Sequence, residues 1–393
     1  MQKKILVLGG GMVGSVMAAD LSSNKDSSNY DVTVMDINVE RISKLIKTNN
    51  LKNITTLTKD LNDLESENSF VNELQHYDII VGAVPGFMGY KTVKAVLQKG
   101  KPIIDISFFP EDYSPLNQIA IENNTYGVFD IGVAPGVANL LLGYYNQIMK
   151  ITDFQCLVGG LPYQRKLPFE YKAPFSPIDV LEEYTRPARL KINNEIIIKD
   201  ALSEPELINF EKVGTLEAFN TDGLRSIITS FPNIPNLKEK TMRFPGHIDL
   251  IKNLKMIGLL DETEIEIISN NQKVNIKPIE LTSKLLIDSW KLDDKDDEFT
   301  VMQIKIKGEN LSNKKIETVQ YDLFDRKDFT TGYSSMARTT GFTATALVNY
   351  ALENAGKIPI GFYPPELISN KEICDYIFNY LKSRNVNYSI NII

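Results

Sequence analysis

The chain has 393 residues, with 43 lysines and arginines against 50 aspartates and glutamates, so its formal net charge is -7. Hydrophobic residues at 43% and charged residues at 24% are ordinary for a soluble globular protein and exclude wholesale disorder. The acidic balance argues against nucleic acid as a partner, and two cysteines cannot build a disulfide framework or a cysteine-rich zinc site. The apolar N-terminus is too short to cross a membrane, and its glycines stand where a signal peptide would carry leucines. We therefore expect a cytoplasmic α/β protein with no membrane partner.

The first part of the chain alternates short apolar runs with segments of helical spacing. The expected strands are residues 5–8, 31–36, 78–85, 102–106 and 127–131, and the expected helices are residues 13–21, 39–46 and 89–99. Such alternation predicts a doubly wound parallel sheet with helices on both faces.

The pattern changes after about residue 154. Strands rich in Val, Ile and Thr follow one another without full helices between them; they are expected at residues 154–159, 189–198, 263–268, 299–307 and 316–324. This pattern predicts a second, α+β domain with a mixed, largely antiparallel sheet. Residues 161–187, rich in Pro, Tyr and Phe, are expected to form a long ordered loop near a site. Residues 343–355 are expected to form a helix that returns to the first domain.

The segment after the first expected strand carries a glycine pattern. Gly9, Gly11 and Gly14 form G-x-G-x-x-G between a strand and a helix, which suits a tight turn, close approach to a pyrophosphate and close helix–strand packing. Asp36 ends the next expected strand, where a carboxylate accepts hydrogen bonds from the adenine ribose. The alternative is a glycine turn in another α/β protein, with Asp36 as a helix cap. We predict dinucleotide binding.

Asp36 also bears on the choice of dinucleotide. A 2′-phosphate carries nearly two negative charges and is repelled by a neighbouring carboxylate. Arg41 could soften this repulsion, but no basic residue directly follows Asp36. NAD is therefore expected rather than NADP.

Ligands of a doubly wound sheet bind beyond the carboxyl ends of its strands. Small or polar residues follow three of these ends, at residues 82–85, 105–108 and 130–136. The second half adds cationic candidates in apolar, turn-rich contexts: Lys172, Arg186, Arg189, Arg225, Arg243 and His247. Arginine forks are what buried carboxylate ligands require, although single arginines also form surface ion pairs. No motif indicates a metal site or an α/β-hydrolase.

Several longer segments resemble the saccharopine dehydrogenase family. They are GGGMVG near the start, FDIGVAPGVANLLLGYY (129–145), VGGLPYQRKLPFEYKAPFSPIDVLEEYTRPAR (158–189), VGTLEAFNTDGLRS (213–226), KTMRFPGHIDLIKNLKMIGLL (240–260) and GFYPPE (361–366). The resemblance implies oxidation of a C–N bond with NAD or NADP. It also implies a Rossmann domain over 1–130, completed by 335–393, and a substrate-binding and dimerisation domain over 131–334, in a homodimer.

The resemblance also implies roles for individual residues. The residues implied at the cofactor are Gly9, Gly11, Met12, Val13, Gly14, Asp36, Val84, Pro85 and Asp105. The residues implied at the substrate are Ser107, Phe108 and Asp130, with Arg225 and Arg243 receiving its carboxylates. Lysine 6-dehydrogenases match the central segments better than fungal saccharopine reductases do, but typically lack arginines at 186, 189 and 225.

Oxidation of an amine also requires proton transfer, for which Asp130, His247 and Lys172 are the candidates. His247 could instead be a structural histidine that caps the next helix. A dinucleotide-binding sensor without turnover remains a further alternative, because fold does not guarantee chemistry.

Charge counting addresses the substrate. Saccharopine carries three carboxylates and lysine one, and each buried carboxylate requires a cationic partner. The arginines and Lys172 therefore favour saccharopine, oxidised to glutamate and 2-aminoadipate 6-semialdehyde. The alternatives are L-lysine 6-dehydrogenase and then carboxynorspermidine dehydrogenase.

Overall fold

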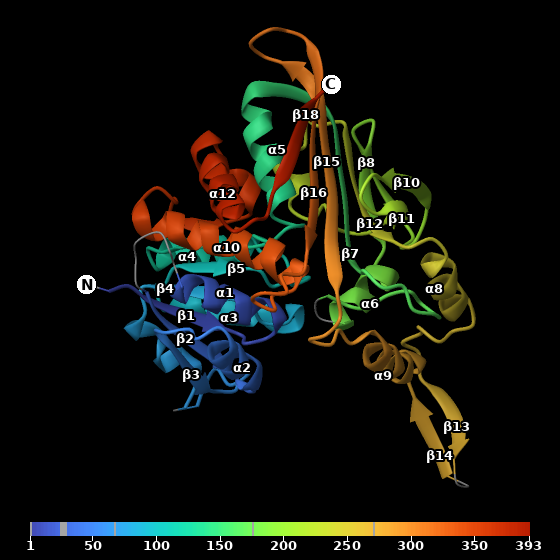
Figure 1. Ribbon diagram of the computed structural model, residues 1–393, viewed down its shortest axis with the longest axis horizontal. Coiled ribbons are helices and arrows are strands. Elements are labelled where there is room, and N and C mark those ends of the chain that lie inside the picture. Colours follow the sequence, from blue (N-terminus) through green and yellow to red (C-terminus); the bar gives the residue numbers. More distant parts are fainter. Residues whose placement is uncertain (1, 24–29, 67, 175–176, 270–271) are drawn as a thin grey trace.

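The computed structural model describes residues 2–23, 30–66, 68–174, 177–269 and 272–393, which form two large sheets side by side (Figure 1). Seven parallel strands form the first sheet, in the spatial order β17 (Gly361–Tyr363), β6 (Tyr126–Val128), β5 (Ile103–Asp105), β4 (Ile79–Gly82), β1 (Lys4–Leu8), β2 (Asp31–Asp36) and β3 (Ile54–Thr58). The strand order 3-2-1-4-5-6 within it is that of a doubly wound nucleotide-binding fold. The predicted parallel sheet is confirmed.

Helices cover both faces of this sheet because its strands are apolar on both sides. Ile5 and Val7 of β1 pack into one core, and Leu6 and Leu8 pack into the other. The helices of the first layer are α1 (Met12–Ser22), α2 (Glu40–Thr48), α10 (Ser335–Glu353) and α12 (Lys371–Ser383). The second layer contains α3 (Gly86–Gln98), α4 (Ser114–Glu122) and the short 3-10 turns Phe70–Asn72 and Leu74–His76.

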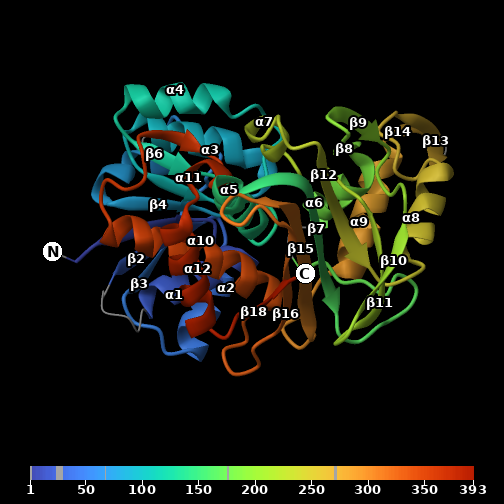
Figure 2. The same cartoon turned by 90° about the horizontal axis from the view of Figure 1, so that it is seen from above.

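The C-terminal part of the chain returns to the first sheet. Helix α10 packs on α1, and β17 pairs with β6 in parallel. Seen from above, α10 and α12 lie over the first domain (Figure 2). Helix α10 begins at Ser335, earlier than expected, because the Ser334 hydroxyl caps it by accepting a 3.3 Å hydrogen bond from the Ala337 amide.

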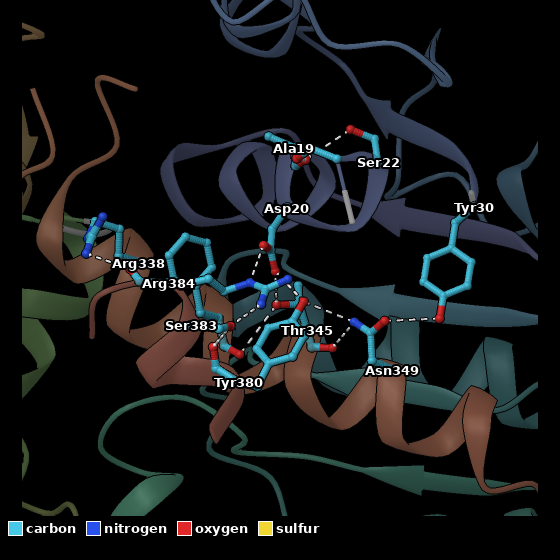
Figure 3. A network of polar contacts seen from close by, with 12 residues as sticks. Ala19, Asp20, Ser22, Tyr30, Arg338, Thr345, Asn349, Tyr380, Ser383 and Arg384 are labelled. Atoms are coloured by element: carbon cyan, nitrogen blue, oxygen red, sulfur yellow. Dashed lines mark hydrogen bonds and ion pairs between the residues drawn. The ribbon is translucent and has the colours of Figure 1, made fainter. Parts of the chain in front are cut away.

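A buried carboxylate on α1 fastens this returning segment (Figure 3). Asp20 accepts hydrogen bonds from Arg384 Nε at 2.6 Å, Tyr380 Oη at 2.7 Å and Thr345 Oγ1 at 2.5 Å. Its side chain is only 8% exposed, so all three contacts lie in a region largely shielded from water. Residues far apart in sequence thereby share one polar core.

The second sheet is mixed. Its main path runs in the order β10 (Glu206–Phe210), β11 (Gly214–Asn220), β12 (Asn236–Arg243), β7 (Met149–Pro162), β15 (Glu298–Asn310), β16 (Ile316–Arg326) and β18 (Tyr388–Ile392). Strand β8 (Ala188–Ile192) pairs with β12 and with β9 (Glu195–Lys199). Only β12 and β7 pair in parallel among the described strands of this sheet, so the predicted mixed, largely antiparallel sheet is confirmed. The last strand, β18, joins this sheet rather than the first.

The remaining elements are α5 (Val137–Ile148), α6 (Pro177–Thr185), α7 (Ile227–Ser230), α8 (His247–Met256), α9 (Pro278–Trp290), α11 (Pro365–Ile368) and the projecting hairpin β13 (Ile265–Ser269)–β14 (Gln272–Ile276), seen in Figure 1. Helix α6 occupies part of the segment expected to be a loop. Val180, Leu181 and Tyr184 give it a buried apolar face at helical spacing, which its Pro- and Tyr-rich surroundings mask in the sequence. Among the described helices, none combines the length and apolar character needed to cross a bilayer.

Candidate active site

A cavity of about 580 Å³ lies at the carboxyl ends of the parallel strands, lined by both domains. From the first domain it is lined by, among others, Gly9, Gly11, Met12, Val13, Gly14, Asp36, Val84, Pro85, Ser107, Phe108 and Asp130. From the second domain it is lined by, among others, Glu182, Glu183, Arg186, Thr221, Asp222, Gly223, Glu239, Thr241 and Arg243. This volume is in the range of small-molecule and cofactor sites.

The glycine loop has the shape that a pyrophosphate requires. Gly9 has a φ of +104°, and a Cβ there would lie 2.4 Å from the Ala83 carbonyl oxygen. A Cβ on Gly14 would lie 2.0 Å from the Gly9 carbonyl oxygen, so α1 packs closely on the loop. Gly11, by contrast, faces open space within 4 Å, and α1 begins at the next residue. The loop therefore fits a dinucleotide, with helix N–H groups directed toward its phosphates.

Asp36 stands at the end of β2, beside this loop. Its Oδ2 accepts a 2.6 Å hydrogen bond from the Gly10 amide, and its Oδ1 accepts a 2.8 Å hydrogen bond from the Asn38 amide. Asp60 lines the cavity in the same domain. No lysine or arginine of the described first domain is among the residues that line the cavity. The charged side chains that the described first domain contributes to the lining are therefore all acidic.

Asp105 lies directly behind the cavity lining and bonds to Ser107, a lining residue. It is fully buried and is not one of the lining residues; its Oδ2 accepts hydrogen bonds from the Ser107 amide at 3.0 Å and the Ser107 hydroxyl at 2.5 Å. Burial raises the pKa of Asp105 to about 8. A Cβ on Gly82 would lie 1.9 Å from Asp105 Oδ1, so the strands leave room for this carboxyl group only. Asp105 thus fixes the loop that carries Ser107 and Phe108.

Asp130 and Arg225 form an ion pair across the two domains. Arg225 Nε lies 2.7 Å from Asp130 Oδ2, and Arg225 Nη2 donates to the Phe109 carbonyl oxygen at 2.8 Å. The guanidinium also lies 4.0 Å from the centre of the Phe108 ring. Burial raises the pKa of Asp130 to about 6, and the Arg225 charge opposes this rise. Asp130 lines the cavity, whereas Arg225 stands behind it.

The other arginines also have carboxylate partners. Arg243 Nη2 donates to Glu183 at 2.8 Å, and Arg186 pairs with Glu182 one helical turn away. Arg189 forms a third pair, in which its Nε and Nη2 donate to the two carboxylate oxygens of Asp222 at 2.8 and 2.9 Å. Counting cations in the sequence therefore overestimates the positive charge that is free to receive a substrate.

The structure does not bring His247 or Lys172 to the cavity. His247 Nε2 lies 2.9 Å from the Tyr184 hydroxyl, and Nδ1 lies 2.9 Å from the Phe169 carbonyl oxygen. The imidazole is packed among aromatic rings including Trp290, and burial lowers its pKa to about 3. His247 therefore has structural contacts, but it is the first residue of α8 and does not cap it, because the N-cap is Gly246 and no described side chain caps this end of the helix. Lys172 donates to the Lys291 carbonyl oxygen at 2.9 Å, also outside the cavity lining.

Glu239 is a cavity residue that the sequence did not indicate. It lies on β12, is 7% exposed, and accepts hydrogen bonds from the Thr221 hydroxyl at 2.7 Å and the Gly223 amide at 3.1 Å. Burial raises its pKa to about 8. Nothing in the sequence distinguishes Glu239 from other charged residues, because its neighbours in the chain are Lys238 and Lys240 and only the structure shows that β12 is largely buried.

The fold and cavity define a two-domain protein with a Rossmann-type dinucleotide-binding domain. Residues 5–128 match the saccharopine dehydrogenase NADP binding domain, and residues 132–386 match the saccharopine dehydrogenase C-terminal domain. The chain therefore belongs to the saccharopine dehydrogenase family.

Individual relatives are distant in sequence. The protein is 25% identical to saccharopine dehydrogenase (NADP(+), L-glutamate-forming) of Schizosaccharomyces pombe. This match covers 277 residues, which are 67% of this chain and 60% of the relative. The protein is 24% identical to the Saccharomyces cerevisiae enzyme of the same name, over 98% of this chain and 100% of the relative. The match thus spans less than two thirds of the S. pombe protein.

Two solved structures share the fold. Apo histidine-tagged saccharopine dehydrogenase (L-Glu forming) from S. cerevisiae aligns over 100% of both chains with a TM-score of 0.79 and 19% identity. Homospermidine synthase from Legionella pneumophila, solved in complex with NAD, aligns over 100% of this chain and 92% of the other, with a TM-score of 0.65 and 11% identity. At these identities, the likeness concerns the fold.

Proposed function

We propose that the protein is a nicotinamide-dinucleotide-dependent dehydrogenase that oxidises a C–N bond of an amino-acid substrate, with saccharopine as that substrate. The observation that carries the proposal is the cavity of about 580 Å³, which joins a glycine loop from one domain to an ionisable wall from the other. Family membership supports the reaction class, and the names of the fungal relatives support saccharopine. The balanced reaction takes saccharopine, oxidised dinucleotide and water to glutamate, 2-aminoadipate 6-semialdehyde, reduced dinucleotide and a proton.

The residues proposed to hold the dinucleotide are Gly9, Gly11, Met12, Val13 and Gly14 at the pyrophosphate, Asp36 at the adenine ribose, and Val84 and Pro85 along its length. When bound, the nicotinamide supplies the hydride acceptor. NAD rather than NADP is proposed, because a 2′-phosphate would meet a wall that carries carboxylates and no described cation. The fungal relatives carry NADP(+) in their names, so this choice needs its own test.

Asp130 is proposed to handle the substrate proton. An amine loses hydride only from its neutral form, so a base must remove the ammonium proton first. Asp130 lines the cavity, and its pKa of about 6 leaves it ionised at neutral pH. Arg225 holds the carboxylate in place at 2.7 Å, while Ser107 and Phe108 border the substrate.

The test is the appearance of reduced nicotinamide absorbance when purified protein is mixed with NAD and a candidate substrate. Saccharopine is expected to give glutamate and the semialdehyde in equal amounts with reduced cofactor. Turnover of L-lysine without turnover of saccharopine would establish the second candidate, which the uncompensated carboxylate of Glu239 favours. Binding of NAD without turnover of any amine would instead indicate a sensor.

We also propose a homodimer that forms through the second domain's sheet. Strands β9 and β10 expose Ile196, Ile198 and Leu207 to solvent by 58%, 69% and 67% of their surfaces. Apolar side chains on strands outside the centre of a sheet favour association. A solution mass near 44.3 kDa by light scattering, the mass of one chain, would contradict the dimer.

A further inference from the structure

The second-domain wall of the cavity has more acidic than basic side chains. Four carboxylates, Glu182, Glu183, Asp222 and Glu239, line it beside two arginines, Arg186 and Arg243. Three of the carboxylates have arginine partners in the described structure, as set out above. Glu239 is the exception, since no described lysine or arginine lies within ion-pair distance of it.

The surroundings of Glu239 hold its carboxyl group in one place without supplying a cationic partner. Thr221 and Gly223 both donate to Oε2, and the Thr221 hydroxyl also lies 2.9 Å from the Thr241 hydroxyl. A Cβ on Gly223 would lie 2.3 Å from Glu239 Oε2, so the glycine allows the backbone to approach the carboxylate. Both donors engage the same oxygen, which leaves Oε1 without a protein donor among the hydrogen bonds of the described residues.

A carboxylate in this position gains from a cation that enters the cavity. Burial raises the pKa of Glu239 to about 8, and the charges of Glu183 and Asp222 add to the rise. A cationic ligand would offset both the lost hydration and this repulsion. A substrate of the proposed reaction carries such a cation, because amino-acid amines are protonated at neutral pH.

We propose that Glu239 receives an ammonium group of the substrate and makes a cationic nitrogen a requirement for binding. This inference rests on the proposed function for the identity of the substrate. Glu239 is then a specificity residue, and Thr221 and Gly223 are positioning residues that aim it. Dicarboxylates without an amine are excluded, because they offer no cation to pair with Glu239.

The experiment is calorimetric titration of the NADH-loaded protein with L-saccharopine, L-lysine and glutarate, a dicarboxylate without nitrogen. Glu239→Gln keeps the shape and the acceptor oxygen but removes the charge. We expect wild-type protein to bind an amine-bearing probe, and Glu239→Gln to weaken that binding by about tenfold to a hundredfold. Glutarate affinity is expected not to fall, and NADH affinity is expected to stay unchanged. The exposed Glu280→Gln on α9 is the matched control.

Equal affinity of wild type and Glu239→Gln for the amine-bearing probes would overturn the proposal, as would failure of the wild type to bind either of them. If Glu239→Gln does not fold, Glu239→Asp retracts the charge by one methylene and is expected to weaken amine binding without weakening glutarate binding. Unchanged amine affinity in that variant would also overturn it. Glu239-dependent binding without turnover would refute the proposed function alone. Turnover with equal kcat/KM in wild type and Glu239→Gln would refute this inference alone.

Discussion

Asp130 and Arg225 meet at 2.7 Å across the domain boundary, and both have positive φ angles, 55° and 42°. Neither residue is glycine, so the backbone at each carries a conformation that L-residues rarely adopt. The ion pair is buried, and its arginine is the one that the family resemblance assigned to a substrate carboxylate. Arg225 therefore acts on the cavity through Asp130.

Replacing Arg225 by Gln should destabilise the protein. Removal of one partner leaves a buried charge uncompensated, which costs about 3–5 kcal/mol. Urea denaturation measures this loss, and the double variant Asp130→Asn/Arg225→Gln is expected to recover part of it. Lys371→Ala, in an exposed pair with Asp375, serves as the control and should cost less than about 1 kcal/mol. Equal losses of unfolding free energy in Arg225→Gln and Lys371→Ala would show that the buried ion pair contributes no more than an exposed one.

The rate of amine oxidation should depend on the ionisation of Asp130. The carboxylate accepts a proton only when ionised, so kcat/KM is expected to rise with pH through about 6. Asp130→Asn should abolish this acidic limb of the pH profile, the rise of kcat/KM through pH 6, and lower the rate by about a hundredfold to ten-thousandfold. His247→Asn should retain the limb, because His247, with a pKa of about 3, is neutral throughout this range. A limb near pH 6 that disappears in His247→Asn but persists in Asp130→Asn would reverse the assignment.

Asp36 should control the choice of dinucleotide. Asp36→Ser removes the charge beside the expected ribose, so NAD binding is expected to weaken while NADP binding strengthens. The ratio of the two dissociation constants, measured by fluorescence titration of the reduced cofactors, should shift by at least about tenfold toward NADP. Tighter binding of NADPH than of NADH by the wild type would contradict the proposed preference for NAD and would match the NADP(+) in the names of the fungal relatives.

Asp20 should fasten the C-terminal segment to the first domain. Asp20→Asn cannot match the charge of Arg384 Nε, which lies 2.6 Å from the carboxylate. We expect a loss of unfolding free energy of about 3–5 kcal/mol relative to wild type. Hydrogen exchange in the variant should be faster than in wild type in α12 and unchanged in α3. Exchange that accelerates equally in both helices would show that the contact does not act locally.

The parts of this architecture that were predictable from sequence are encoded locally. Gly9, Gly11 and Gly14 combine with the strand and helix around them in one short segment, and Asp36 follows within the same unit. Ion-pair partners are different, because they depend on tertiary contacts between distant residues. Arg225 looked free in the sequence because its partner, Asp130, belongs to the other domain.

The same limit explains two further differences. Glu239 appears in the sequence as one charge among many, and only the burial of β12 distinguishes it. The spacing of Val180, Leu181 and Tyr184 on α6 became informative once the core that receives them was known. His247 was equally compatible with a catalytic or structural role until its two ring nitrogens were seen to have protein partners.

The most direct test of the central claim is isotope transfer from saccharopine. The substrate is deuterated at the methylene carbon of its lysine part that bears the secondary nitrogen, and the reduced cofactor is analysed by mass spectrometry after incubation with NAD. The account predicts deuterated NADH, with glutamate as the released amino acid, because hydride leaves that carbon. Unlabelled NADH with release of lysine, or no NADH at all, would contradict it.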